Sequence, residues 1–457
     1  MTEIAPTVVT YSAKVPEEPE DAPKSIMEVS MVTYVARPMT ASEFEEAMAW
    51  IKRSSESVKD TFKKAKKFYD DKNIGGALKA IAGVGNIVSG VMKFLPEEKD
   101  PMIENLANLE TDVKKLGEKL NENMGEMKLH ISDIKFYDAI MKPTSVLTRF
   151  MRDCLRSPGE AAKKNFERAY NDTSPLSIQY KLYAYLNQKT TNPLVINMDI
   201  QKVKSKSTFE KWEDMISRVM AQFLYLEAFG SGLLKGGEVS KDRLLESSEK
   251  VFELLDTWKT EYMKDQNYWG DLKEFFEPFI SKATGMSNTE KANRIREKLE
   301  DYLTSDAFYF CVFNDVKWNE KYTYWCPNEK DQIIGAWGKG RCNAFVYRSR
   351  RATKMGQDDY QKIRNQTLQC ADGKLRWTGS LNNIIKNQLI DQSLLGGYGF
   401  ICLIEARSDP VIFDLNALPP DWLNKGPGHQ GSALMDLGNG DRREMKIIVS
   451  FNCIFFF

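Results

Sequence analysis

The side chains that most often carry out acid–base and metal chemistry are scarce in this sequence. Only two histidines occur in 457 residues, His130 and His429. Histidine is the commonest general base near neutral pH and the commonest metal ligand. The cysteines offer no replacement, because no C-x-x-C pair is present and Cys311, Cys326 and Cys342 lie too far apart for a zinc knuckle. We therefore expect no metal ion, no cofactor and no enzymatic activity.

Two further patterns suggest acid–base catalysis and phosphate binding, but the spacing of their residues does not fit either. Asp358-Asp359 and Glu97-Glu98 are paired carboxylates, but adjacent residues do not face each other on a helix. Gly83-Val84-Gly85 lacks both the third glycine and the Lys-Ser/Thr pair of a phosphate-binding loop. An enzyme that uses carboxylates or tyrosines in the last third of the chain stays open as the weakest alternative.

The cysteines are unevenly distributed. Cys154 stands alone, and the other six fall in the last third of the chain: Cys311, Cys326, Cys342, Cys370, Cys402 and Cys453. Six clustered cysteines could form three disulfides in an oxidising compartment. Six reduced thiols inside a β-rich core are an equal alternative, and the sequence does not choose between them.

Charge and hydropathy narrow the classes of partner. Lys+Arg and Asp+Glu both count 64, which argues against a nucleic-acid binder, because such a protein needs a basic excess on one face. An anionic membrane would have to be met by a local patch. No stretch reaches the roughly 18 to 20 uncharged apolar residues of a transmembrane helix, so we expect a protein made in soluble form. The first residues lack the basic start and apolar core of a signal peptide. Cytosolic residence, a leader outside this numbering and another export route all stay open.

The elements that could position any functional group fall into three parts. Residues 1–38 contain the acidic, proline-rich run PEEPEDAP and are expected to form an extended arm. Residues 39–304 show helical periodicity, and we expect an elongated α-helical bundle there. Heptad-like seams run from Leu106 to Ile134 and from Phe209 to Leu226, and looser ones from Leu244 to Tyr262 and from Ala292 to Tyr302.

Residues 305–457 differ from the helical part in composition and in the length of their apolar runs. Short runs rich in aromatic and β-branched residues alternate with turn signals such as Gly338-Lys339-Gly340. This pattern predicts a smaller, β-rich, sandwich-like domain that bears the cysteines. The fold class is therefore α+β, with a helical bundle followed by a β-rich C-terminal domain.

One segment of the helical part is unusually apolar and rich in small residues. Residues 74–95 read IGGALKAIAGVGNIVSGVMKFL, and each of the five glycines costs a helix in water about 1 kcal/mol relative to alanine. A helix of 22 residues would be about 33 Å long, close to the thickness of a bilayer core. We predict a membrane-insertion segment formed by Ile74, Leu78, Ile81, Gly83, Val84, Gly85, Val88, Val91, Met92 and Leu95. The alternative is a central buried helix of the bundle, and the two are compatible because an inserting helix must first be sheltered.

A cationic cluster follows one of the β-like runs. Arg348, Arg350, Arg351 and Lys354 could contact lipid headgroups or an anionic receptor. The alternative for these residues is an ordinary solvated loop.

The order of these parts resembles a known family. The segment GGALKAIAGVGNIVSGVMKFLP precedes the heptad helix IENLANLETDVKKLGEKLNENMGEMKLHISDIKF, and a β-rich part opening on CVFNDV comes later. This order resembles the box-jellyfish-type pore-forming cytolysins and the related rapunzel proteins, whose helical part is compared with the pore-forming domain of insecticidal crystal toxins. The resemblance covers residues 40–330 and rests on pattern. The N-terminus departs from the cytolysins and fits the rapunzel-like members better.

The resemblance implies a membrane-active, pore-forming protein that self-associates on a lipid membrane. In that reading the bundle inserts apolar helices, and the β-rich domain recognises a cell-surface glycan or protein receptor. The alternative is a non-lytic intracellular scaffold of rapunzel-like type, whose seams contact protein partners.

Overall fold

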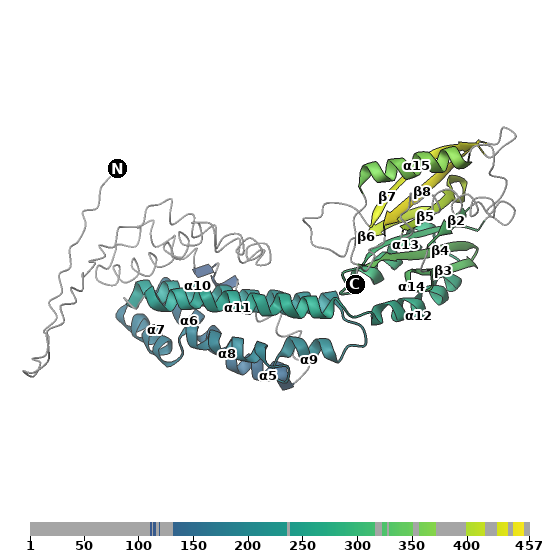
Figure 1. The fold of residues 1–457 in the computed structure, drawn as a ribbon. Helices are drawn as coiled ribbons and strands as arrows, with labels where there is room; N and C mark the ends of the chain where they lie inside the picture. The colour runs from purple at the N-terminus through teal and green to yellow at the C-terminus, as the bar shows by residue number, and fades with distance from the viewer. Residues whose placement is uncertain are drawn as a thin grey trace, which may run out of the picture. The chain divides into compact units, whose positions relative to one another are not determined.

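The computed structural model describes residues 110–111, 113–115, 118, 131–234, 238–315, 322–326, 329–350, 356–371, 399–415, 427–436 and 442–451. Contacts divide the chain into two compact units (Figure 1). The first comprises Met1–Pro193 and Glu213–Phe252, and the second comprises Leu194–Trp212 and Glu253–Phe457. We call them the helical unit and the β-rich unit.

The described part of the helical unit consists of helices. They are α5 (Ile131–Phe136), the π-helical turn η1 (Tyr137–Met141), α6 (Lys142–Arg156), α7 (Glu160–Asp172), α8 (Pro175–Asn187) and portions of α10 (Lys206–Leu234) and α11 (Glu238–Tyr262). The break after α6 coincides with Ser157-Pro158-Gly159. The next helix start is capped, because the Ser174 hydroxyl accepts a hydrogen bond from the Ser177 amide at 3.2 Å.

The β-rich unit contains the remaining helices and all the described strands. Its helices are α9 (Pro193–Asp199), α12 (Asn267–Lys282), α13 (Asn288–Glu300), α14 (Glu329–Gln332), α15 (Gln357–Ala371) and the short 3₁₀ turn η4 (Ala406–Ser408). Its strands are β1 (Ala307–Asn314), β2 (Tyr322–Trp325), β3 (Ile333–Lys339), β4 (Cys342–Ser349), β5 (Gly399–Glu405), β6 (Val411–Leu415), β7 (Gly428–Asp436) and β8 (Arg442–Phe451). The described strands form two antiparallel four-stranded sheets, ordered β3-β4-β1-β6 and β2-β5-β8-β7. The predicted fold class, a helical region followed by a β-rich region, is confirmed.

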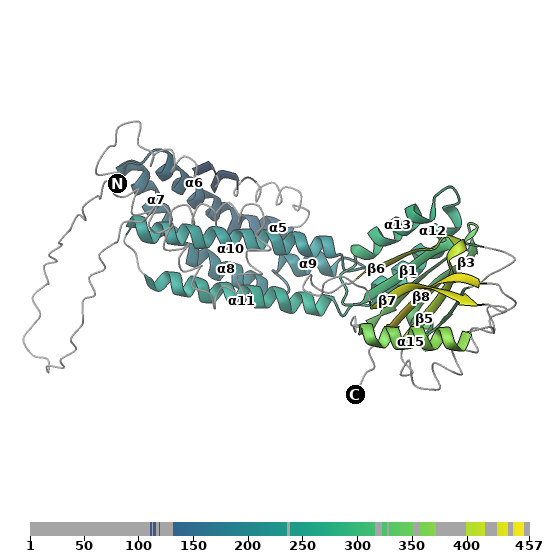
Figure 2. The ribbon, with the colours of Figure 1, turned by 90° about the horizontal axis from the view of Figure 1, so that it is seen from above.

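The β-rich unit is layered (Figure 2). The two sheets pack face to face over a core that includes Tyr309, Phe345 and Phe400. Helices α12 and α13 cover the outer face of the first sheet, where Phe276 and Ile295 meet Phe310. Helix α15 lies against β7 and β8 of the second sheet. Strand β1 is consequently buried on both faces, which explains its almost uninterrupted apolar run.

Helices α12 and α13 differ in placement from the sequence expectation. Both helices fall within residues 39–304, which are expected to form the bundle, because a helical pattern does not reveal which surface its apolar face meets. Their buried residues instead join the core of the first sheet. The β-rich unit therefore includes helices that lie before residue 305. Helix α13 begins with a capping box, in which Ser287 and Glu290 each accept a hydrogen bond from the other's backbone amide.

The predicted seams vary in outcome. Every member of the second seam (Phe209, Trp212, Ile216, Val219, Phe223, Leu226) and of the fourth (Ala292, Ile295, Leu299, Tyr302) is buried. In the third, Leu255 is buried in place of Leu254. Most of the first seam lies outside the described residues, and its last member, Ile134, is exposed. Among the helices that the structure describes, none combines the length and apolar character needed to cross a membrane.

The turn between β3 and β4 requires glycine. Gly338 and Gly340 have φ angles of 64° and 56°, in the left-handed region that residues with a Cβ avoid. A Cβ on Gly340 would lie 2.4 Å from the carbonyl oxygen of Ile280 on α12. The glycine therefore permits both the turn and the close approach of the hairpin to this helix.

Candidate functional site

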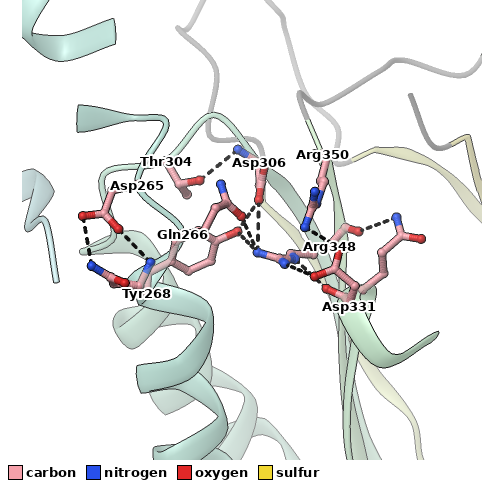
Figure 3. Close-up of polar contacts among 10 residues, drawn as sticks. Asp265, Gln266, Tyr268, Thr304, Asp306, Asp331, Arg348 and Arg350 are labelled. Atoms are coloured by element: carbon pink, nitrogen blue, oxygen red, sulfur yellow. Dashed lines mark hydrogen bonds and ion pairs between the residues drawn. The ribbon is translucent and has the colours of Figure 1, made fainter. Parts of the chain in front are cut away.

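A cluster of polar side chains surrounds Arg348 (Figure 3). Arg348 lies near the end of β4 and is only 1 % exposed. Its partners come from the start of α12, from the segment before β1 and from α14. Because these segments are distant in sequence, the cluster forms only when the β-rich unit is folded.

The guanidinium makes four hydrogen bonds within the β-rich unit. Its Nε donates to the Asp331 carbonyl oxygen at 2.8 Å, and its Nη2 donates to Asp331 Oδ1 at 2.8 Å. Its Nη1 donates to Gln266 Oε1 at 2.7 Å and to the Tyr268 hydroxyl at 3.1 Å. Asp306 Oδ2 lies 3.7 Å from the same nitrogen. Asp306 and Asp331 supply negative charge around a cation that has left water.

Aromatic rings complete the surroundings of this cation. The guanidinium carbon lies 4.2 Å from the centroid of the Trp269 ring and 5.7 Å from that of Tyr268. A desolvated cation over an indole gains about 2 kcal/mol from the ring quadrupole. The planar guanidinium can stack and donate at once, which an ammonium group cannot.

Tyr268 cannot serve as a base in this environment. Its hydroxyl donates to the Asp306 carboxylate. Burial raises the pKa of the Tyr268 phenol far above its usual value, the negative charge of Asp306 raises it further, and Arg348 opposes both. The phenol therefore stays protonated and acts as a hydrogen-bond donor to the carboxylate.

The contacts of Arg348 hold neighbouring elements of the β-rich unit in place, and its burial leaves the guanidinium inaccessible to a ligand. It ties the beginning of α12 and the α14 turn to the first sheet. Arg348 is buried and makes four hydrogen bonds inside the unit, so contact with a headgroup or receptor stays a prediction only for Arg350, Arg351 and Lys354. Arg350 is a third exposed and pairs with the Asp331 carboxylate. Arg351 and Lys354 lie outside the described residues.

The cysteines are thiols wherever the structure describes their side chains. Cys154, Cys311, Cys326, Cys342 and Cys402 are free, so none of these five is in a predicted disulfide, while Cys370 and Cys453 lie outside the described side chains. Burial raises the pKa of the Cys311 thiol, with a further contribution from Cys402. Burial likewise raises the pKa of Cys154 to about 12. Such thiols are poor nucleophiles.

The other predicted positions contribute no catalytic grouping. The predicted insertion segment, from Ile74 to Leu95, and His130 lie outside the described residues. His429, on β7, packs its ring against Tyr360 with centroids 5.5 Å apart. Across the described ranges, no three His, Cys, Asp or Glu side chains gather in a way that could hold a metal ion.

Sequence reasoning missed most of the Arg348 cluster. Gln266, Tyr268 and Trp269 fall in the range expected to form the bundle, Asp306 and Asp331 fall in the range expected to be β-rich, and no motif marks any of them. The single signal in the sequence is an arginine inside an apolar strand, because a charge at a buried strand position requires buried partners.

The fold and the site define an α+β protein of two units. One unit is helical, and the other contains two packed sheets whose first sheet is linked to α12 and α14 by the buried Arg348. Residues 104–442 match the model of a family described as protein of unknown function (DUF684), and the chain belongs to that family. The comparison with curated proteins finds no match. The comparison with solved structures finds none either. The family assignment therefore comes without a named relative, and the likeness to cytolysins remains a hypothesis.

Proposed function

We propose that this protein acts on membranes, with a helical unit that shelters apolar helices and a β-rich unit that recognises the target surface. The observation that carries the proposal is the burial of α10. Every residue from 215 to 230 is buried, on all faces of the helix. A helix buried all round is the centre of its bundle, and a bundle of this kind can hide apolar segments from water until a lipid surface replaces their neighbours.

The polar groups of α10 are compatible with such a central position. Arg218 makes two hydrogen bonds to the Asp214 carboxylate one turn earlier, at 2.7 and 3.1 Å. Glu227 accepts from the Tyr170 hydroxyl of α7 at 2.8 Å. Arg218 and Glu227 thus each have a partner within the unit, which avoids the cost of an unpaired buried charge. Tyr170 also lies against Gly230, where a Cβ would come within 2.7 Å of its ring.

The inserting segment in this proposal is Ile74–Leu95, on the strength of its sequence. Its apolar stripe and its five glycines distinguish it from the described helices, none of which could cross a bilayer. The β-rich unit is compact by itself, so it can present a receptor-binding surface without depending on the bundle's conformation. The target is a lipid membrane bearing a glycan or protein receptor, on which the protein self-associates.

The test is dye release from liposomes by the purified full-length protein, with and without anionic lipid. Leakage that rises with protein concentration is expected, and Val84→Asp and Gly83→Leu are expected to abolish it. Ala161→Asp is a matched control, because it adds a negative charge at an exposed position of α7. Circular dichroism checks that all variants stay helical. Leakage by Val84→Asp at the wild-type level would remove the insertion segment from the proposal, and no leakage by any protein would overturn it.

A second candidate is an intracellular scaffold, and the buried thiols favour it. Cys311 and Cys402 are reduced and packed in the core between the two sheets. Reduced core thiols are typical of proteins in reducing compartments. Titration of free thiols in protein from its native source, under denaturing conditions, distinguishes the candidates. Seven free thiols together with inert liposomes would support the scaffold, and any disulfide would oppose it.

A further inference from the structure

A buried lysine contacts a buried cysteine in the β-rich unit. Lys291 on α13 is 4 % exposed, and Cys342, the first residue of β4, is 1 % exposed. The Lys291 Nζ donates a hydrogen bond to Cys342 Sγ at 3.5 Å, across 51 positions of the chain. Cys342 also belongs to the core that α12 and α13 form with the first sheet. An amine and a thiol therefore meet in an apolar environment that holds them together.

The charge of this pair restricts its protonation. A lysine ammonium in an apolar core requires a compensating group, because an unpaired buried charge is costly. Within the described ranges, no carboxylate lies within ion-pair distance of Lys291, and its hydrogen-bond acceptor is the Cys342 sulfur. The pair is electrically neutral either as ammonium and thiolate or as amine and thiol. The first form contains the nucleophile of thiol oxidation, and the second contains a free amine.

Lys291 distinguishes Cys342 from the cysteines between the two sheets. Burial raises the pKa of the Cys342 thiol, the charge and the hydrogen bond of Lys291 lower it, and Asp315 raises it. Burial also raises the pKa of Cys311 and of Cys402, where the described chain places no cation to oppose the rise. The thiolate is the form that peroxides oxidise. Of these three buried thiols, Cys342 is therefore the one whose surroundings favour oxidation.

Cys342 lies beside an exposed turn. Gly338 and Lys339 of the β3–β4 turn are exposed, and so is Arg341, which directly precedes the cysteine. Turns open locally at a lower free energy than the strands of a core do. Local opening of this turn gives a small, neutral oxidant such as hydrogen peroxide a route to Cys342, whereas Cys311 lies in the middle of β1 between the sheets.

We propose that Lys291 and Cys342 form a site of reversible oxidative cross-linking, which takes a hydroperoxide and yields a sulfenamide. In the first step, the Cys342 thiolate attacks one oxygen of hydrogen peroxide, the O–O bond breaks, and the sulfur becomes a sulfenic acid. The second oxygen leaves as hydroxide, which takes a proton from the Lys291 ammonium and becomes water. This proton transfer leaves Lys291 as a neutral amine next to an electrophilic sulfur.

The second step forms the cross-link. The Lys291 amine attacks the sulfur of the sulfenic acid, an S–N bond forms and the S–O bond breaks. The sulfenic oxygen leaves as water, with one proton from the amine. Overall the sulfur loses two electrons, and one peroxide becomes two waters. Dithiothreitol reverses the reaction, because its thiolate attacks the sulfur and releases the amine, and its second thiolate then forms the cyclic disulfide and releases the Cys342 thiol.

The bond would join α13 to β4 covalently. A cross-link between distant positions of the chain stabilises the folded state by restricting the unfolded one. The urea unfolding midpoint should therefore rise after treatment with peroxide and return to its starting value after dithiothreitol. This inference does not depend on the proposed action on membranes, since all of its residues lie in the β-rich unit.

The experiment treats native full-length protein with limited hydrogen peroxide, blocks the remaining thiols with iodoacetamide and identifies tryptic peptides by mass spectrometry. The expected product joins residues 283–294, uncleaved after Lys291, to residues 342–348. Its mass is that of the two reduced peptides less two hydrogen atoms, and dithiothreitol separates them. Protein unfolded in urea should not form this product, because the amine and the sulfur are then no longer in contact.

Two variants test the role of the amine. Lys291→Met removes the amine and should give no cross-linked peptide. Lys250→Met is the matched control, because Lys250 pairs with Glu246 at the surface of the helical unit, and it should form the cross-link as the wild type does. Circular dichroism checks that both variants are folded. Oxidation of Cys342 in the native wild-type protein without the cross-link overturns the proposal, and so does a Cys342 that stays reduced when Cys326 is fully oxidised.

Discussion

Arg348 stacks on Trp269, with the guanidinium carbon 4.2 Å from the ring centroid, and so joins a strand of the first sheet to the first turn of α12. The same guanidinium binds the side chains of Asp331 and Gln266 on its rim. A cation that was expected at a headgroup, receptor or solvent surface is thus buried inside the β-rich unit, where it links β4 to α12 and α14.

Removal of this cation is expected to be severely destabilising. Arg348→Ala leaves the Asp306 carboxylate buried beside Tyr268 without its cation, and breaking a buried pair costs about 3–5 kcal/mol. Arg348→Lys keeps the charge but loses the two-nitrogen contact and the stack, so an intermediate loss is expected. Urea unfolding measures both. Arg294→Ala is the control, because Arg294 pairs with Glu297 at the surface, and an equal loss there would contradict the assignment.

The β3–β4 turn gives a second stability prediction. Gly340→Ala combines a positive φ with a Cβ only 2.4 Å from the Ile280 carbonyl, so a loss of more than about 1 kcal/mol is expected. Gly270→Ala in α12 meets nothing within 4 Å and should gain up to about 1 kcal/mol from helix propensity. Thermal unfolding of the two variants should shift in opposite directions. A neutral Gly340→Ala would show that the turn is not as tight as described.

The buried tyrosines predict sensitivity to alkali. Burial raises the pKa of Tyr268 and of Tyr309 above the unfolded value of about 10. The folded state therefore holds these protons more tightly, so their contribution is complete below pH 10 and is lost as the pH rises above it. Unfolding free energy should fall above pH 10, and tyrosinate absorbance from these residues should appear only with loss of tertiary structure. Ionisation of Tyr268 or Tyr309 in native protein at pH 11, recognised as tyrosinate absorbance that the corresponding Tyr→Phe variant lacks, would contradict this.

Thiol reactivity offers a fourth prediction. Cys311 and Cys402 are buried in the inter-sheet core, whereas Cys326 is partly exposed. Native protein treated with iodoacetamide should be alkylated at Cys326 well before the two buried cysteines, and urea should abolish the difference. Peptide mass spectrometry reads each site separately. Equal rates in native protein would mean that the sheets open readily.

The spacing of apolar residues predicted which segments form helices, but not which elements these helices pack against. The seam from Phe209 to Leu226 and the capping box of Ser287 and Glu290 depend on residues within one helix, so the sequence contains the whole signal. The cap of α10 shows the limit of that reasoning. The spacing of Ser207 and Glu210 predicts a capping box that starts the helix at Ser207. In the structure the helix begins at Lys206, and the Ser205 hydroxyl accepts the hydrogen bond from the Thr208 amide.

The Arg348 cluster and the position of α12 could not be predicted in the same way. Both depend on which surfaces meet, and the partners of Arg348 span from Gln266 to Asp331. An amphipathic helix packs equally well on another helix or on a sheet, so the pattern of α12 and α13 fits either. The predicted insertion segment stays a prediction, since it lies outside the described residues.

The two units are interleaved along the chain. Unit membership changes between Pro193 and Leu194, between Trp212 and Glu213, and between Phe252 and Glu253. The two stretches of the β-rich unit, Leu194–Trp212 and Glu253–Phe457, are joined by backbone hydrogen bonds. The Lys206 amide donates to the Asp301 carbonyl, and the Leu303 amide donates to the Lys204 carbonyl. No single cut of the chain therefore separates the two units, because each unit is made of two stretches that alternate with those of the other. Either unit can therefore be produced alone only from a rejoined chain, for example residues 194–212 linked directly to residues 253–457 for the β-rich unit.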